Sequence, residues 1–134
     1  MENCLFCKII AGEIPCHKIY EDDEVLAFLD ITNDPEGHTL VIPKKHSVNL
    51  MDTDSDTFAY TCEIAQEVAQ HYVNIGYADG INIYINSGED SGQEVMHLHI
   101  HILPRKKDDG INFARTEKKS DKPLAEVAET LRLN

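Results

Sequence analysis

The chain has 134 residues, of which 42% are hydrophobic and 27% charged, a composition typical of one soluble globular domain spanning residues 1–134. Its net charge of −12 leaves no basic surface that could release counterions from a nucleic-acid backbone, so we expect no nucleic-acid partner. No apolar run approaches the ~18 residues of a membrane span and no secretory signal is evident, so we expect no membrane association and a cytoplasmic location.

Short elements fill the first half of the chain. Residues 4–10 predict a helical turn. In residues 17–31, apolar segments flank an acidic turn at residues 21–23, which predicts two strands. Residues 31–37 contain Pro and Gly and predict a loop. Residues 38–43 predict a strand that ends at its final proline, which has no N–H to donate to a sheet.

The second half begins with the main predicted helix, residues 55–75, whose apolar residues recur at three-to-four spacing behind Asp54 or Ser55 as the cap. Residues 80–86 alternate as a strand and residues 87–93 form a Gly-containing loop. Residues 94–103 predict a second strand, so that the pair forms a hairpin with a seven-residue loop.

A polar, irregular stretch follows at residues 104–119, and Pro123 begins a closing helix. Together these elements predict an α+β fold: a five-stranded antiparallel sheet with one main helix and short N-terminal and C-terminal helices.

Three histidines alternate with apolar residues in the last predicted strand. Because side chains on a strand alternate between faces, His97, His99 and His101 share one side, which we expect to face a cleft or solvent. The apolar residues between them then pack under the main helix.

A single metal ion cannot be bound by all three of these histidines on a regular strand. At ~3.3 Å per residue, His97 and His101 lie roughly 13 Å apart, and metal–nitrogen bonds of ~2 Å cannot span that distance. Alternating imidazoles suit an extended anion, or a reaction that separates a nucleophile from a proton donor, because neutral imidazole attacks phosphorus well. The glycines of residues 87–93 would let backbone N–H groups approach a phosphate. The alternative is three surface histidines that only satisfy hydrogen bonds.

The run HLHIHIL at residues 97–103 resembles the histidine triad motif. The segments CLFCKIIAGEIP, YEDDEVLAFLDI, GHTLVIPKKH and INSGEDSGQ also resemble, in the same order, the nucleoside phosphoramidase branch of the histidine triad family and its bacterial relatives. The similarity covers a motif-bearing core at residues 4–105 and leaves residues 106–134 as a C-terminal extension.

The resemblance implies the histidine triad fold, usually as a homodimer. It implies hydrolysis or transfer at the α-phosphorus of a purine nucleotide through a covalent nucleotidyl-histidine. His99 would be the nucleophile, with its other ring nitrogen donating to the carbonyl of His97. His101 would contact the phosphate, and His38 would complete the cluster.

The same resemblance implies nucleotide contacts. The Asp30 carboxylate would receive the ribose hydroxyls. The positions around the base would be Leu5, Phe6, Ile9, Phe28, Leu29 and Ile31, and those on the phosphate side Asn86, Gly92 and Gln93. Ile9 and Phe28 would be core residues in any fold of this sequence.

Glu94 departs from the family pattern, in which Ser or Thr is common at this position. A carboxylate beside a phosphate is repelled unless protonated, and a protonated one could donate to the leaving group. If the strand runs unbroken from residue 94, Glu94 lies on the face opposite the histidines.

Cys4 and Cys7 form a Cys-x-x-Cys pair that is either half of a zinc site or two reduced, packed thiols. The resemblance implies that His46 and His97 complete a closed, structural Cys₂His₂ zinc site. No partners are implied for Cys16, Cys62, His17 or His71.

Three other functions stay open. The ending HILPRKK resembles that of dinucleoside polyphosphate hydrolases of the same family. The chain could instead be a nucleotide-binding regulator with vestigial hydrolysis, or a zinc-binding interaction module.

Overall fold

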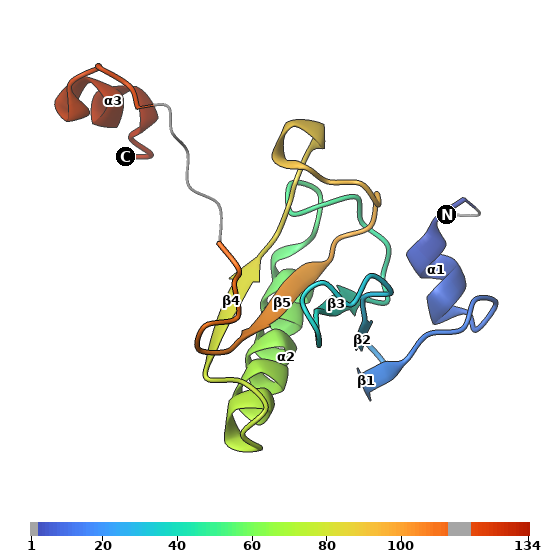
Figure 1. Ribbon diagram of the computed structural model, residues 1–134. Helices are drawn as coiled ribbons and strands as arrows, with labels where there is room; N and C mark the ends of the chain where they lie inside the picture. Colours follow the sequence, from blue (N-terminus) through green and yellow to red (C-terminus); the bar gives the residue numbers. More distant parts are fainter. Residues whose placement is uncertain (1–2, 113–118) are drawn as a thin grey trace.

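The protein is described here by a computed structural model, which defines residues 3–112 and 119–134 (Figure 1). Its elements in chain order are α1 (Leu5–Ile10), β1 (Lys18–Glu21), β2 (Val25–Leu29), β3 (Thr39–Pro43), α2 (Ser55–Asn74), β4 (Gly80–Tyr84), the 3₁₀ turn η1 (Glu89–Ser91), β5 (Ile100–Arg105) and α3 (Leu124–Leu131).

The five strands form one antiparallel sheet in the order β1-β2-β3-β5-β4, which confirms the predicted α+β fold. The two faces bury different cores. Val25 and Ala27 of β2 pack with the buried side of α2, whereas Leu26 and Phe28 pack on the other face with Phe6 of α1. This is the two-residue alternation expected of a strand that is covered on both sides.

The main helix lies where the spacing of apolar residues predicts it. Asp54 caps α2 by accepting a hydrogen bond from the Thr57 N–H, and the buried face includes Ile64, Val68 and Tyr72. Ile100 and Ile102 belong to the same core, so the apolar side of the histidine strand does pack under α2.

The last strand begins later than predicted. β5 starts at Ile100, not at residue 94, and residues 85–99 connect it to β4 in place of a seven-residue loop. The register pairs Val41 with Ile100, so the ladder would next need an N–H from Pro43, which has none. Before that point the chain leaves the sheet, and the Leu98 N–H donates to the Ser47 carbonyl.

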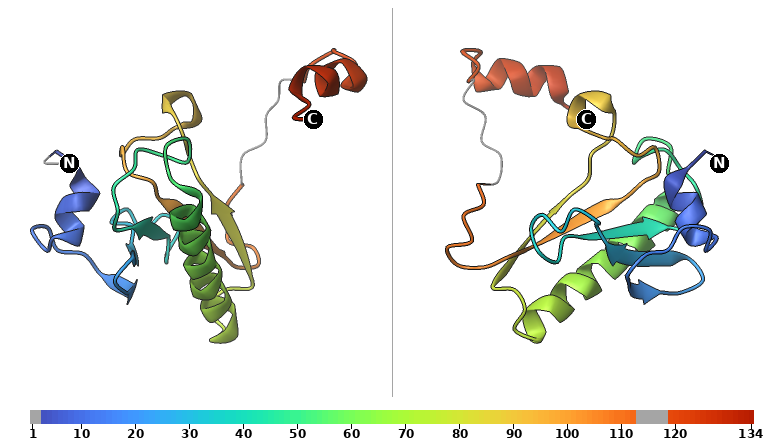
Figure 2. Two further views of the ribbon diagram at one scale, coloured as in Figure 1. Left: turned by 180° about the vertical axis from the view of Figure 1, so that it is seen from behind. Right: turned by 45° about the vertical axis from the view of Figure 1, so that its right-hand side comes forward.

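Helix α3 lies apart from the sheet, beyond its β4 edge, in all three views (Figures 1 and 2). It begins directly after Pro123, as the sequence predicts, and its Leu124 and Leu131 side chains are exposed. In the described parts of the chain, every helix is too short or too polar to cross a membrane.

Candidate active site and metal cluster

His99 lies at the centre of the candidate site, on the sheet face covered by α1. Its Nδ1–H donates to the His97 carbonyl oxygen at 2.7 Å. A carbonyl only accepts, so in the neutral ring this bond places the proton on Nδ1 and leaves a lone pair on Nε2. The sequence resemblance implies this same bond.

An aromatic side chain from α1 covers the central histidine. The Phe6 ring lies edge-on to His99 and His97, with centroids 5.1 and 5.9 Å away, and 5.5 Å from Phe28. All three triad histidines are buried, with at most 9% of each exposed, so their side of the chain does not face open solvent.

Burial decides the charge of these rings because it penalises the imidazolium form. It lowers the pKa of His99, and it lowers that of His97 to about 4 and that of His101 to about 3. The neighbouring rings of His99 and His38 lower the pKa of His101 further. All three imidazoles are thus uncharged at neutral pH in the ligand-free protein.

His38 and His101 form a direct pair, with His38 Nε2 2.9 Å from His101 Nδ1. His38 Nδ1–H donates to the Asp34 carbonyl, so in the neutral pair His38 Nε2 accepts from His101 Nδ1–H. His101 Nε2 then remains, and among the described residues it is the one buried side-chain nitrogen or oxygen without a hydrogen-bond partner. A buried orphan of this kind favours a ligand at that atom.

Tyr84 is a neighbour of the triad that the sequence reasoning missed. It pairs with His101 across β4 and β5, and the two rings stack with centroids 4.2 Å apart and an angle of 10°. Only the strand register reveals this contact, because nothing in the local sequence links the two residues.

A cavity of about 450 Å³ lies between α1 and the strand β2 with the residues that follow it. All seven residues predicted for the base and ribose line it: Leu5, Phe6, Ile9, Phe28, Leu29, Asp30 and Ile31. The sequence reasoning missed Ile14, Pro15, Cys16, His17, Thr32, Leu40 and Val95. Most of these follow α1 or flank β2, so closeness in sequence to the predicted residues was the available signal.

Asp30 is the acidic group of this cavity wall. Its Oδ1 accepts hydrogen bonds from the backbone N–H and the hydroxyl of Thr32, at 2.8 and 2.7 Å. Burial raises the pKa of this carboxyl, but the Thr32 bonds and the nearby His38 and His101 outweigh it and lower the pKa overall. Asp30 is therefore an ionised acceptor at neutral pH.

The predicted phosphate-side residues lie in the β4–β5 connection and do not line this cavity. The buried Gln93 amide holds the connection together: its Oε1 accepts from Gly88 N–H at 2.9 Å and its Nε2 donates to the carbonyls of Val48 and Val95. Gly92 has φ +101°, and a Cβ there would lie 3.5 Å from Asn86 Nδ2. Their contact with a phosphate stays a prediction.

Glu94 is exposed and lines the same cavity as Phe6 and Asp30. The condition for placing it opposite the histidines, an unbroken strand from residue 94, is not met, because the chain joins the sheet only at Ile100. Strand parity does not extend through the preceding irregular segment.

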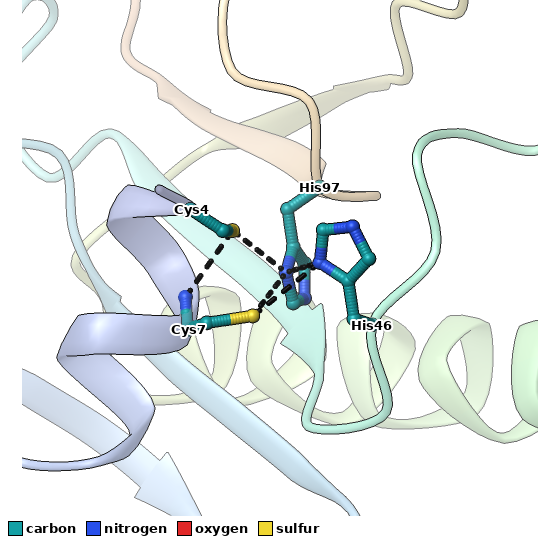
Figure 3. A group of neighbouring side chains, drawn as sticks. All are labelled: Cys4, Cys7, His46 and His97. Carbon is teal, nitrogen blue, oxygen red and sulfur yellow. Dashed lines mark hydrogen bonds between the residues drawn. The ribbon is translucent and has the colours of Figure 1, made fainter. Parts of the chain in front are cut away.

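Cys4, Cys7, His46 and His97 converge from three separate segments (Figure 3). Cys4 caps α1 and Cys7 lies in its first turn, while His46 follows β3 and His97 precedes β5. Their four donor atoms lie within 4.8 Å of one another, and within the described residues they form the one histidine, cysteine and carboxylate group of this kind.

The donor geometry fits a tetrahedral ion. Bonds of ~2.0–2.3 Å would separate ligand atoms by roughly 3.3–3.8 Å. Here His46 Nδ1 lies 3.2 Å from His97 Nδ1 and 3.3 Å from Cys7 Sγ, and Cys4 Sγ lies 3.4 Å from His97 Nδ1. His97 Nε2–H donates to the Pro43 carbonyl at 2.8 Å, which turns the Nδ1 lone pair into the cluster.

Comparison with curated proteins gives close relatives. The chain is 47% identical over 120 residues to an uncharacterized HIT-like protein of Borreliella burgdorferi, covering 88% of this chain and 86% of the relative. It is 37% identical over 134 residues to the adenylylsulfatase HINT3 of Arabidopsis thaliana, covering 97% of this chain and 68% of the relative.

Solved structures share the fold. A HIT family member from Bacillus subtilis superposes with a TM-score of 0.85 at 38% identity, covering 98% of both chains. A zinc-bound histidine triad family protein from Mycobacterium smegmatis gives a TM-score of 0.80 at 42% identity, covering 87% of this chain and 85% of that one. The family model of the HIT domain matches residues 11–108, and the chain therefore belongs to the HIT family.

Proposed function

We propose that this HIT-family protein hydrolyses nucleoside 5′-phosphoramidates, or related nucleotide conjugates, through a covalent intermediate on His99. The hydrogen bond from His99 Nδ1–H to the His97 carbonyl carries the proposal, because it leaves a fixed lone pair on Nε2. The cavity lined by Phe6 and Asp30 supports a purine nucleotide as the ligand, with the Asp30 carboxylate as acceptor for ribose hydroxyls.

In this mechanism the bond from His99 Nε2 to the α-phosphorus forms as the P–N bond breaks, and the leaving amine takes up a proton from solvent. Water then attacks the nucleotidyl-histidine, releases the nucleotide and returns a proton to solvent, which restores the neutral ring. Each step exchanges one group at phosphorus, which splits one difficult displacement into two.

The His38–His101 pair would supply the charge that such a phosphate needs once it takes up a proton. Phosphoryl oxygens only accept hydrogen bonds, and adding one proton to the pair creates a donor at the buried His101 Nε2. The proton also places one positive charge beside the substrate, which would support the transition state. Substrate binding and protonation of this pair would therefore favour each other.

Zinc is the proposed occupant of the Cys4, Cys7, His46 and His97 cluster, and the zinc-bound relative from Mycobacterium smegmatis supports this. Two thiolates and two imidazoles would close the coordination sphere, so the ion would be structural. It would hold the first turn of α1 against the segment that carries His97.

The first experiment looks for the intermediate. The protein is mixed with an adenosine 5′-phosphoramidate, quenched, and examined by mass spectrometry for a nucleotidyl adduct on His99. We expect His99→Ala to keep its fold by circular dichroism, to show no adduct and to lose about 10⁴-fold or more in kcat/KM. His71→Ala, an exposed histidine of α2, is the matched control. Undiminished turnover by His99→Ala would end the assignment.

Substrate comparison separates the rival functions. We compare kcat/KM for AMP-morpholidate, a diadenosine polyphosphate and adenosine 5′-phosphosulfate. The preferred substrate distinguishes a phosphoramidase from a dinucleoside polyphosphate hydrolase and from an adenylylsulfatase, the activity named for HINT3. A vestigial regulator would bind AMP without forming an adduct, and a zinc-binding module would show no stabilisation by nucleotide in thermal melts.

The homodimer is also a proposal. Strand β4 is an edge of the sheet, and an apolar groove of about 450 Å³ lies between it and α2, lined by Ala65, Ala69, Ile81, Ile83 and Ile85 among others. An uncharged, apolar edge strand is a ready template for pairing with a second copy.

A further inference from the structure

The nucleotide cavity is unusual in its charge. Of the residues that line it, Asp30 and Glu94 are acidic, and none is Lys or Arg. The remaining ionisable groups are Cys16 and the exposed His17. A substrate that brings several negative charges would meet two carboxylates here.

Lys8 lies on α1 between Phe6 and Ile9 but does not line the cavity. Three other described cations, at the ends of β3 and β5, are paired elsewhere. Lys44 binds Glu21 at 2.9 Å, Lys45 binds Asp54 at 3.0 Å, and Arg105 binds Asp109 at 2.8 Å. The chain as a whole carries a net charge of −12. One added proton on the His38–His101 pair would offset the charge of one phosphate. The described residues that line the cavity include no Lys or Arg that could offset the charge of a second anionic group.

Glu94 lies where the nucleotide cavity meets a second one. It lines both, together with Leu5 and Val95. The second cavity, about 420 Å³, is also lined by Val48, Met96, Asn3, Cys4 and His46, again without Lys or Arg. Its wall is thus largely apolar with a single carboxylate at the junction, which fits a hydrocarbon stem that ends in a cation.

We propose that this second cavity holds the leaving group and that Glu94 selects amines carrying an additional, positively charged nitrogen. This rests on the proposed phosphoramidase function. The reaction is unchanged: the P–N bond breaks, His99 Nε2 takes the phosphorus, and the diamine leaves with an added proton. Leaving groups that end in a carboxylate, sulfate or phosphate are repelled by Glu94 in the same position.

Three substrates of matched length test the proposal: the adenosine 5′-phosphoramidates of 1,4-diaminobutane, pentylamine and 4-aminobutyrate, which end in an ammonium, a methyl and a carboxylate group. We expect kcat/KM to fall in that order, by roughly two- to fivefold per unit of charge, since Glu94 is exposed and partly screened. Raising the salt concentration to ~0.5 M should narrow the differences.

The variants identify the responsible residue. In Glu94→Gln the ammonium and carboxylate substrates should differ by less than about twofold. Glu89→Gln is the matched control, because Glu89 is an exposed acid of the same connection that lines neither cavity. It should keep the full charge preference.

Equal rates for the three amidates in the wild-type protein would overturn the selection by Glu94 and leave the phosphoramidase function standing. A charge preference that persists in Glu94→Gln, or that disappears in Glu89→Gln, would also overturn it. If no amidate is turned over and no adduct forms on His99, the proposed function itself fails and this inference falls with it.

Discussion

A single hydrogen bond often decides what the other end of a polar side chain can do. His99 and His97 each use one ring nitrogen to donate to a backbone carbonyl, which directs the remaining lone pair to the candidate nucleophilic position in one case and to the metal cluster in the other. The same ring type thus takes two roles two residues apart. The two roles differ because His99 donates to a backbone carbonyl from Nδ1, whereas His97 donates from Nε2.

Asp22 shows the same effect on a carboxylate. Burial opposes its charge, but hydrogen bonds from the Tyr60 and Tyr20 hydroxyls and from the N–H groups of Glu24 and Val25 outweigh burial and lower its pKa to about 2. Because Tyr60 lies on α2, this carboxylate ties the helix to the β1–β2 turn.

We expect Asp22→Asn to lower the free energy of unfolding by about 1–2 kcal/mol at pH 7. A carboxylate whose pKa is depressed in the folded state stabilises above its unfolded pKa of ~3.9, and this stabilisation is lost as pH falls through about 2. The deficit of the variant should therefore shrink between pH 4 and pH 2 in urea melts. A deficit that stays constant over that range would show that the charge of Asp22 contributes nothing.

Among the elements, α1 connects the proposed zinc cluster to the cavity lined by Phe6 and Asp30. It has only six residues, too few to be stable alone, and both cysteines lie at its N-terminal end. Leu5, Phe6 and Ile9 of the same helix line the cavity. Whatever holds Cys4 and Cys7 therefore also holds one wall of the site.

We expect removal of zinc by a chelator, or the double change Cys4→Ser and Cys7→Ser, to lower Tm and weaken AMP binding together. With free zinc at about 100 times its Kd, the ion would contribute roughly 2.7 kcal/mol, or roughly 10 °C in Tm. Metal content by mass spectrometry, thermal melts and AMP calorimetry measure the three effects. Cys62→Ser, which changes a cysteine of α2 outside the cluster, should leave metal content and AMP affinity unchanged. If zinc is lost and the AMP affinity stays the same, the cluster does not influence nucleotide binding through α1.

At the scale of the whole molecule, the sheet ends in an uncharged edge strand, β4, that is half-buried apart from Ile83. Ile83 on β4 is 47% exposed and borders the groove against α2. An edge with such side chains is usually covered, and a second copy is the proposed cover.

Ile83→Glu should shift the mass measured by light scattering from that of a dimer to that of a monomer, because it places two carboxylates together at a symmetric contact. Ile75→Glu, an exposed position at the C-terminal end of α2 away from this groove, is the control. A wild-type protein that runs as a monomer would remove the dimer from the proposal.

Local patterns in the sequence determined much of this molecule. The two-residue alternation of the histidine segment and the three-to-four spacing in residues 55–75 depend on neighbours along the chain. They therefore predicted that the apolar side of the histidine segment packs under the main helix, and where that helix lies. Tertiary structure alone decided where β5 begins, which ring atoms join His38 to His101, that Tyr84 stacks on the His101 ring, and that Glu94 lines the cavity. These features join residues far apart in sequence and depend on strand register and on the missing N–H of Pro43, which no local periodicity encodes.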